Sequence, residues 1–314
     1  MFYITTKKHK LIKINKTNKT NKTNKINKKV NNSIINMNNK KTILILSGGS
    51  IKGIAHLGGI KVLEEKNIMI NIKTIIGTSI GGIIGCLLLI GYTADELFEF
   101  INLLDLNILK NIDMNLFLDK YGADNRKNFI IVLEKMFELK NININITLNE
   151  LYMMTKKKLI LTTVCINEKK LYYLSYKTHP NLSVITALCM TSSLPLWFIP
   201  VSYEDKLFID GGIMNNYPIN LCMNKLHKVI GFYIDTKEND TEIKNIESYI
   251  MNIMMCISRG LTQNALCRYK QTIKIIIPII NIFDLNLSKQ IKQDLYNVGY
   301  ECVNKYIDKN KNKK

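Results

Sequence analysis

A serine lies in a glycine-flanked turn between two apolar runs, and this unit constrains the fold more than any other feature. The β-branched run Ile72–Ile76 predicts a strand, GTSIG at 77–81 predicts a tight turn, and Ile83–Ile90 predicts a helix. Such a turn holds the hydroxyl of Ser79 out on a sharp bend, while the glycines let neighbouring backbone approach closely. The positive end of the following helix favours negative charge that develops at the serine. The sequence therefore predicts a strand, turn and helix of an α/β fold, with a candidate nucleophile at the bend.

Strand-like and helix-like patterns alternate along most of the chain, which is typical of an α/β domain. Strands are predicted at 42–46, 72–76, 158–166, 171–176, 197–201, 207–209, 228–235 and 272–277. Helices are predicted at 54–66, 83–90, 124–140, 183–191, 241 to about 269 and 288 to about 305. Two more helices are predicted to begin after the capping boxes Thr93–Glu96 and Thr147–Glu150. We therefore expect a mostly parallel sheet covered by helices on both faces.

Two further glycine turns follow predicted strands. GGSIKG at 48–53 places successive backbone N–H groups before a helix, as in an anion-binding nest. This loop lacks the spacing of a dinucleotide-binding loop and the Gly-Lys-Ser/Thr ending of a P-loop. The sequence Asp210-Gly211-Gly212 puts a carboxylate at the end of the strand predicted at 207–209. Sites in open parallel sheets form beyond the carboxyl ends of strands, so we expect all three turns at that edge, which brings together a nucleophile, donors and a carboxylate.

A Ser-His-Asp triad is the competing arrangement. The four histidines are His9, His56, His179 and His227. His9 lies in a basic tail, and His56 is expected to be a packing or surface residue of the helix after the glycine loop. Neither His179, which precedes Pro180, nor His227 has the position that a triad requires, so a Ser–Asp dyad is favoured.

The three turns, in this order and spacing, resemble the patatin-like phospholipases over about residues 42–235. The resemblance implies a three-layer architecture and calcium-independent hydrolysis of lipid acyl esters without a cofactor or metal. It implies Ser79 as nucleophile, Asp210 as proton acceptor, and an oxyanion hole of backbone N–H groups at Gly48, Gly49, Ser50 and Ile51. The residues that support the motifs are Lys52, Gly53, Gly77, Gly81, Gly211 and Gly212.

Two positions of the glycine loop raise separate questions. Ser50 stands where the family usually has a third glycine, and serine tolerates a positive φ less well than glycine. The N–H group survives this change, so the geometry of the loop is in question more than the activity. Lys52 fits the basic position of the family's loop, where it is either solvated or locally paired, or contacts a lipid phosphate.

The net charge of +19 is concentrated in the two ends of the chain. Residues 1–41 contribute +12 and residues 305–314 contribute +4, which leaves +3 for residues 42–304. We expect 1–41 to be a disordered Lys/Asn/Thr-rich tail, 42–304 to be the catalytic domain and 305–314 to be a short basic tail. A solvated tail is the simplest interpretation of 1–41, and attraction to an anionic membrane is the alternative.

No signal peptide or membrane span is expected, although Ile75–Tyr92 is apolar enough to resemble a span. The strand, turn and helix described above account for that run, and seven scattered cysteines are typical of an intracellular protein. The segment from Gly91 to Thr147 is a candidate lid, but its apolar residues are expected to be core. They are Leu116, Phe117, Leu118 and Tyr121.

The function predicted from these features is a lipid acyl hydrolase of the phospholipase A or lysophospholipase type, acting through an acyl-serine. An acyltransferase would use the same acyl-enzyme with an alcohol as acceptor. A non-catalytic lipid- or nucleic-acid-binding protein, led by the basic tails, is the alternative from another class. The expected partners are an acyl-ester lipid and a membrane surface contacted through the tails, with no specific nucleic acid.

Overall fold

The computed structural model describes residues 41–113, 115–236, 243, 246–266, 269–277 and 287–311. Nearly all of the predicted tail 1–41 therefore lies outside the described residues. Its last residue, Lys41, donates from Nζ to the carbonyl oxygens of His227 at 3.2 Å and Val229 at 2.7 Å. These two bonds tie the start of the described chain to the segment that leads into a central strand.

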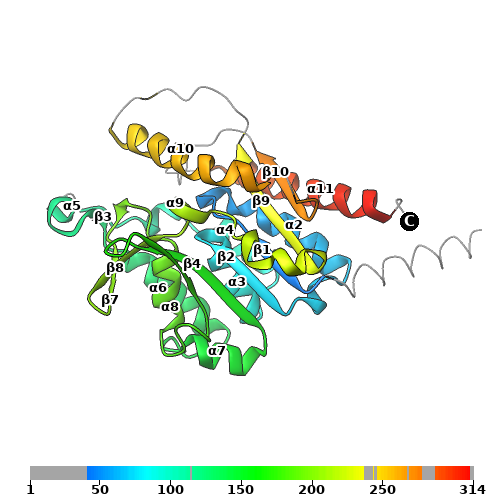
Figure 1. The fold of residues 1–314 in the computed structure, drawn as a ribbon, viewed down its shortest axis with the longest axis horizontal. Helices are drawn as coiled ribbons and strands as arrows, with labels where there is room; N and C mark the ends of the chain where they lie inside the picture. Colours follow the sequence, from blue (N-terminus) through cyan, green and yellow to red (C-terminus); the bar gives the residue numbers. More distant parts are fainter. Residues whose placement is uncertain are drawn as a thin grey trace, which may run out of the picture.

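The β-branched runs form an eight-stranded sheet in the order β10–β9–β1–β2–β4–β8–β7, with β5 paired to β4 (Figure 1). Five neighbouring strands are parallel: β1 Ile43–Leu46, β2 Thr74–Thr78, β4 Lys158–Cys165, β9 Val229–Thr236 and β10 Thr272–Ile277. The others are antiparallel to their neighbours: β5 Lys170–Leu174, β7 Val201–Tyr203 and β8 Lys206–Asp210. The predicted fold class, a mostly parallel α/β sheet, is confirmed.

Helices cover both faces of this sheet. On one side lie α2 Ile54–Glu65, α3 Ile80–Leu89, α4 Ala94–Leu103, α6 Lys127–Leu139, α8 Val184–Thr191 and α11 Lys289–Lys311. On the other lie η4 Ile219–Lys228, α9 Gly212–Asn215 and α10 Ile246–Leu266. The remaining elements are η1 Ser50–Gly53, η2 Met69–Asn71, η3 Leu106–Leu109, α5 Asn115–Lys120, α7 Leu148–Thr155, β3 Gly122–Asp124 and β6 Leu196–Phe198.

Alternation along β1 explains the two layers of core. Leu44 and Leu46 pack into the larger cluster with α2, α3 and α11, whereas Ile43 and Ile45 pack into a smaller cluster with Tyr217. Successive strand side chains point to opposite faces, so a strand buried on both sides has to be apolar at every position. All four residues of β1 are buried, as this rule requires.

Helix starts agree closely with the sequence. Both predicted capping boxes are present, at Thr93 with Glu96 and at Thr147 with Glu150. The membrane-like run from Ile75 is β2, the serine turn and α3. Among the described residues, no helix combines the length and apolar character that crossing a bilayer needs.

Three local predictions were wrong. The strand predicted at 197–201 is split into β6 and β7 around Pro200, because proline lacks the N–H group that a continuous ladder needs. Helix α11 ends at Lys311, beyond the predicted end near Lys305. The apolar residues of α5 and its flank are not core: Leu118 is 82% exposed and Tyr121 61%, and Leu116 and Phe117 are half-buried.

Candidate active site

Ser79 occupies a strained bend between β2 and α3. Its φ of 53° and ψ of −127° lie in a region that costs an ordinary residue roughly 1–3 kcal/mol. The bend is held by the Ser79 N–H, which donates to Thr191 Oγ1 at 3.0 Å, and by the Ser79 carbonyl, which accepts from Gly82 N at 2.9 Å. A Cβ atom on Gly81 would lie 2.5 Å from the Leu46 carbonyl oxygen, so only glycine lets α3 start this close to β1.

Asp210 reaches Ser79 by a route that the sequence analysis described wrongly. The turn at 210–212 does not follow a strand of the parallel set, because β8 is antiparallel to β4 and pairs Asp210 with Thr163. β8 pairs only with the last residues of β4 and runs back toward the serine bend, so its end meets the carboxyl ends of β1 and β2. The three glycine turns are therefore gathered at one edge, as expected, but through an antiparallel strand.

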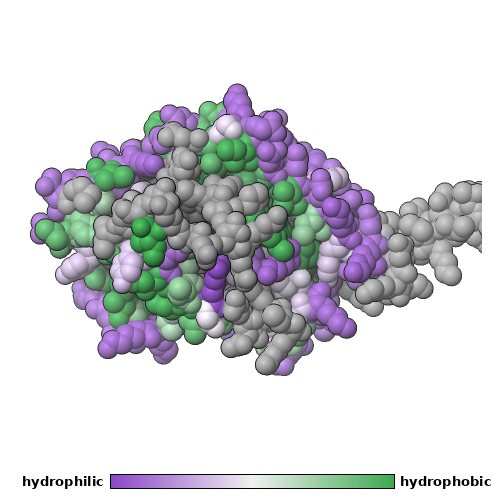
Figure 2. Space-filling view, turned by 90° about the horizontal axis from the view of Figure 1, so that it is seen from above, coloured by the Kyte–Doolittle hydropathy of each residue, from purple (hydrophilic) through white to green (hydrophobic). Residues whose placement is uncertain are grey.

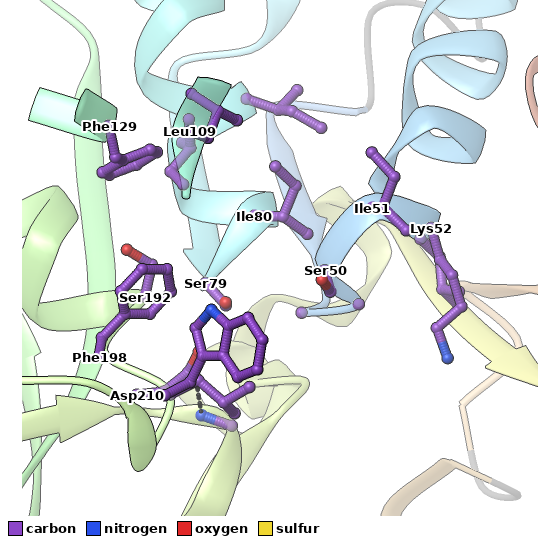
Figure 3. A pocket seen from close by; sticks show the side chains of 18 of the residues that line it. Ser50, Ile51, Lys52, Ser79, Ile80, Leu109, Phe129, Ser192, Phe198 and Asp210 are labelled. Atoms are coloured by element: carbon purple, nitrogen blue, oxygen red, sulfur yellow. Dashed lines mark hydrogen bonds between the residues drawn. The ribbon is translucent and has the colours of Figure 1, made fainter. Parts of the chain in front are cut away.

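Hydrogen bonds fix the Asp210 carboxyl on one side and leave it facing Ser79 on the other (Figure 3). Gly212 N donates to Asp210 Oδ1 at 2.7 Å, and Asp210 N donates to the Ser193 carbonyl at 2.9 Å. The Ser79 side chain is hydrogen-bonded to the Asp210 carboxyl. Burial raises the pKa of Asp210 to about 6, although the bonds from Ser79 and Gly212 act to lower it. The carboxyl is 5% exposed, so loss of hydration dominates.

The glycine loop lies against the same serine. A Cβ atom on Gly48 would approach Ser79 Cβ to 3.3 Å, which shows how closely the loop passes the nucleophile candidate. The Gly48 N–H donates to the Asn216 carbonyl at 3.3 Å and is thus already engaged, so it is a poor choice for the oxyanion donor set. Ser50 has a φ of 51°, the left-handed conformation that glycine adopts with less strain. The departure at Ser50 therefore leaves the loop shape of the family in place.

None of the three described histidines lines the pocket that contains Ser79. His56 is fully buried, with Nε2 2.9 Å from the Ser47 carbonyl oxygen, and its ring stacks with Phe232. Burial lowers the pKa of His56 to about 4, so the ring is neutral and packs beneath the glycine loop. His179 lies against Tyr172, and His227 is in η4.

The pocket has a volume of about 390 Å³ and contains Ser79, Asp210 and the glycine loop. On one side it is walled by apolar side chains of α4, η3 and α6, and Figure 3 shows Phe129 and Leu109 there. These side chains include Leu97, Phe100, Leu106, Phe129, Leu133 and Met136. On the other side it is lined by Lys52, Asp235, Thr236 and Arg259. Among the described residues, no group of His, Cys, Asp and Glu is arranged to hold a metal ion.

Sequence reasoning missed the residues that support the site from a distance. Thr191, Ser193 and Asn216 each accept a hydrogen bond from the backbone of one of the three turns. Arg126 is 3% exposed and its guanidinium donates to Ser193 Oγ at 2.5 Å and to the carbonyl oxygens of Cys189 and Ile199. These contacts join segments far apart in the sequence, and no local pattern announces them.

Comparison with known proteins follows the same lines as the geometry. A family model described as patatin-like phospholipase matches residues 44–223, more than half of the 314 residues. A "Probable lipid hydrolase" of Invertebrate iridescent virus 6 is 36% identical over 194 residues, which are 59% of this chain and 64% of that protein. An uncharacterized protein of Acanthamoeba polyphaga mimivirus is 29% identical over 281 residues, which are 85% of this chain and 93% of that protein.

The fold also has a counterpart among solved structures. VipD from Legionella pneumophila superposes with a TM-score of 0.56 at 18% sequence identity, covering 86% of this chain and 67% of VipD. At that identity the likeness concerns the fold alone. The chain thus spans about two thirds of the length of VipD and of the iridescent-virus protein.

Proposed function

The chain belongs to the patatin-like phospholipase family, and from that premise we propose that it is a serine carboxylic-ester hydrolase acting on lipids. The reaction is of the phospholipase A or lysophospholipase type and uses Ser79 and Asp210 as a dyad. The observation that carries the proposal is the hydrogen bond between the Ser79 side chain and the buried Asp210 carboxyl, inside an apolar pocket. Lipid acyl chains require such a pocket, and an activated serine requires a base within hydrogen-bond reach.

In the first half of the reaction, Ser79 Oγ attacks the ester carbonyl and its proton passes to the Asp210 carboxylate. Negative charge develops on the carbonyl oxygen, where N–H groups of Gly49, Ser50 and Ile51 and the N-terminal end of α3 stabilise it. The carbon–oxygen bond to the alcohol then breaks, and the proton on Asp210 goes to the departing oxygen. The products of this half are a lysolipid or alcohol and an acyl-serine.

In the second half, a water molecule attacks the acyl-serine and gives a proton to Asp210. Collapse of the second tetrahedral intermediate releases the fatty acid, and the proton returns to Ser79 Oγ. An acyltransferase would differ only here, because an alcohol would replace the water. Product analysis with an added acceptor alcohol distinguishes the two, and free fatty acid as the main product is the outcome that supports hydrolysis.

The direct test is hydrolysis of a diacylphospholipid and a lysophospholipid by the purified chain. Ser79→Ala and Asp210→Asn are each expected to lower kcat by several orders of magnitude, since removing a nucleophile or its base disables the whole unit. His227→Ala is the matched control, because His227 lies in η4 outside the pocket and is expected to leave kcat unchanged. Full activity of Ser79→Ala would rule out the mechanism.

We also propose that the protein works at a membrane surface as a peripheral protein. The predicted basic tail lies outside the described residues, but the apolar end of the pocket supports the same idea. Leu103, Ile108 and Leu118 are large exposed apolar side chains in or beside α4, η3 and α5. Figure 2 shows apolar surface at the left end of the molecule, where Figure 1 places α5 and β3. Their neighbours Leu104, Leu106 and Leu109 line the pocket, so a lipid could pass from a bilayer to Ser79 along apolar surface.

A further inference from the structure

The pocket has a positively charged end that the chemistry at Ser79 does not use. Lys52 belongs to the glycine loop, and Figure 3 shows its side chain on the far side of that loop from Ser79. Arg259 approaches the same end from α10, and Asp235 and Thr236 from the end of β9. Ser79 therefore lies between an apolar wall on one side and a group of charged side chains on the other.

Cations outnumber carboxylates at this end of the pocket. The Asp235 carboxylate lies 2.7 Å from Lys274 Nζ and 4.0 Å from Arg259 Nη2. Lys52 is 9% exposed, and within the part of the chain that the structure describes its Nζ has one hydrogen-bond partner, Thr236 Oγ1 at 3.3 Å. A single carboxylate thus faces three positive groups, and the most buried of them has no carboxylate partner there.

A buried ammonium group without a counter-ion is unfavourable. Burial and the neighbouring Arg259 lower the pKa of Lys52, while Asp235 raises it. An anion at this place would restore the balance, and it would receive hydrogen bonds from a guanidinium fork and an ammonium group, which together suit phosphate oxygens.

We propose that Lys52 and Arg259 bind the phosphate of a lipid head group, so that the substrate is an acyl ester of a glycerophosphate and not a neutral glyceride. The assignment rests on the proposed function, since it takes the ester to react at Ser79. The acyl chain then lies along the apolar wall formed by α4, η3 and α6, and the phosphate lies across the glycine loop from Ser79. Lys52 and Arg259 determine specificity and take no part in proton transfer.

The test compares two substrates with the same acyl chain, a lysophospholipid with a phosphate head group and a monoacylglycerol, using the full-length chain. Lys52→Met and Arg259→Gln are each expected to raise KM for the lysophospholipid about 10- to 100-fold relative to KM for the monoacylglycerol, as loss of one charge-assisted hydrogen bond implies. Lys52→Arg is expected to recover most of the preference. Lys274→Met is the matched control, because Lys274 pairs with the same Asp235 but does not line the pocket.

An equal loss on both substrates would overturn the assignment, because Lys52 would then support the glycine loop and not the head group. Unchanged KM ratios in both variants would overturn it as well. Inorganic phosphate separates a free anion from a head group: if it raises the Tm of the wild-type chain while the KM ratio stays near one, the cations bind a free anion and the head-group assignment is wrong. Labelling of Ser79 by a fluorophosphonate with no head-group preference refutes this inference alone, whereas no labelling and no hydrolysis refutes the proposed function.

Discussion

At Asp210, burial and hydrogen bonding act on one carboxyl group in opposite directions. Burial raises its pKa to about 6, and the bonds from Ser79 and the Gly212 N–H restrain the rise. A base works best when its pKa lies near the working pH, because it is then ionised and still takes up a proton readily. An unperturbed aspartate, with a pKa of about 3.9, would be a poor base at neutral pH. The sequence could name the residue but not its environment, which depends on β8 folding back against β4.

The acid limb of the pH profile tests this environment. The rate of hydrolysis of a soluble ester is expected to fall about tenfold per pH unit below a midpoint of about 6, because only ionised Asp210 accepts the serine proton. The measurement is kcat/KM against pH with a substrate that has no titrating group. A midpoint near 4 would show that Asp210 is not the base or is not buried in the free protein.

Stability should depend on the same proton. Between pH 3.8 and about 6 the folded chain keeps a proton on Asp210 that the unfolded chain has lost, so the free energy of unfolding falls as pH rises and levels off above 6. The shift corresponds to about 3 kcal/mol at neutral pH, by the usual conversion of about 1.4 kcal/mol per pH unit. Asp210→Asn is expected to lose this pH dependence while losing activity. Urea unfolding of both proteins at pH 4 and pH 7 measures it, and identical pH trends would contradict the account.

At the scale of single elements, close backbone approach decides which glycines can change. Gly81→Val places its Cβ 2.5 Å from the Leu46 carbonyl oxygen, so it is expected to lower the free energy of unfolding by about 3 kcal/mol and to abolish hydrolysis. Gly260→Ala in α10 is the matched control. Nothing lies within 4 Å of its added methyl group, and helix propensity predicts a gain of about 0.5–1 kcal/mol. A stable, active Gly81→Val protein would show that the turn is drawn too tightly.

Elements with a strong local signal were predicted well. The capping boxes, the strands of the parallel set and the serine turn all depend on contacts between neighbours in the sequence. The direction of β8 depends on how far β4 extends and on which edge is vacant, and neither is visible locally. The same is true of α5, whose apolar side chains resemble core until the fold leaves Leu118 at the surface.

At the scale of the whole molecule, the three glycine turns could be predicted because each carries its own motif. The support around them could not, since Thr191, Arg126 and Asn216 come from separate parts of the chain. The pairing of Lys52 with Arg259 likewise depends on α10 packing over the end of β9. The predicted domain limits remain a proposal, and deletion of residues 1–40 with retained esterase activity would support a catalytic unit that begins near residue 42.

The apolar end of the molecule can be tested as a membrane contact. Leu118→Asp is expected to reduce hydrolysis of phospholipid vesicles several-fold, while hydrolysis of a soluble short-chain ester stays unchanged. Leu139→Asp, at the other end of α6 from the pocket-lining Phe129, is equally exposed and serves as the control. Equal effects of the two substitutions on vesicle hydrolysis would argue against a contact centred on α5.

The central claim is that Ser79 is activated by Asp210 through a direct hydrogen bond, and fluorophosphonate labelling tests it without knowledge of the true substrate. Mass spectrometry of the labelled wild-type chain is expected to find one modified serine, Ser79, with labelling slowed by orders of magnitude in Asp210→Asn. His56→Ala, if folded, is expected to label at a rate close to that of the wild type. Rapid labelling of Ser79 in Asp210→Asn, or labelling of another serine with Ser79 untouched, would contradict the account.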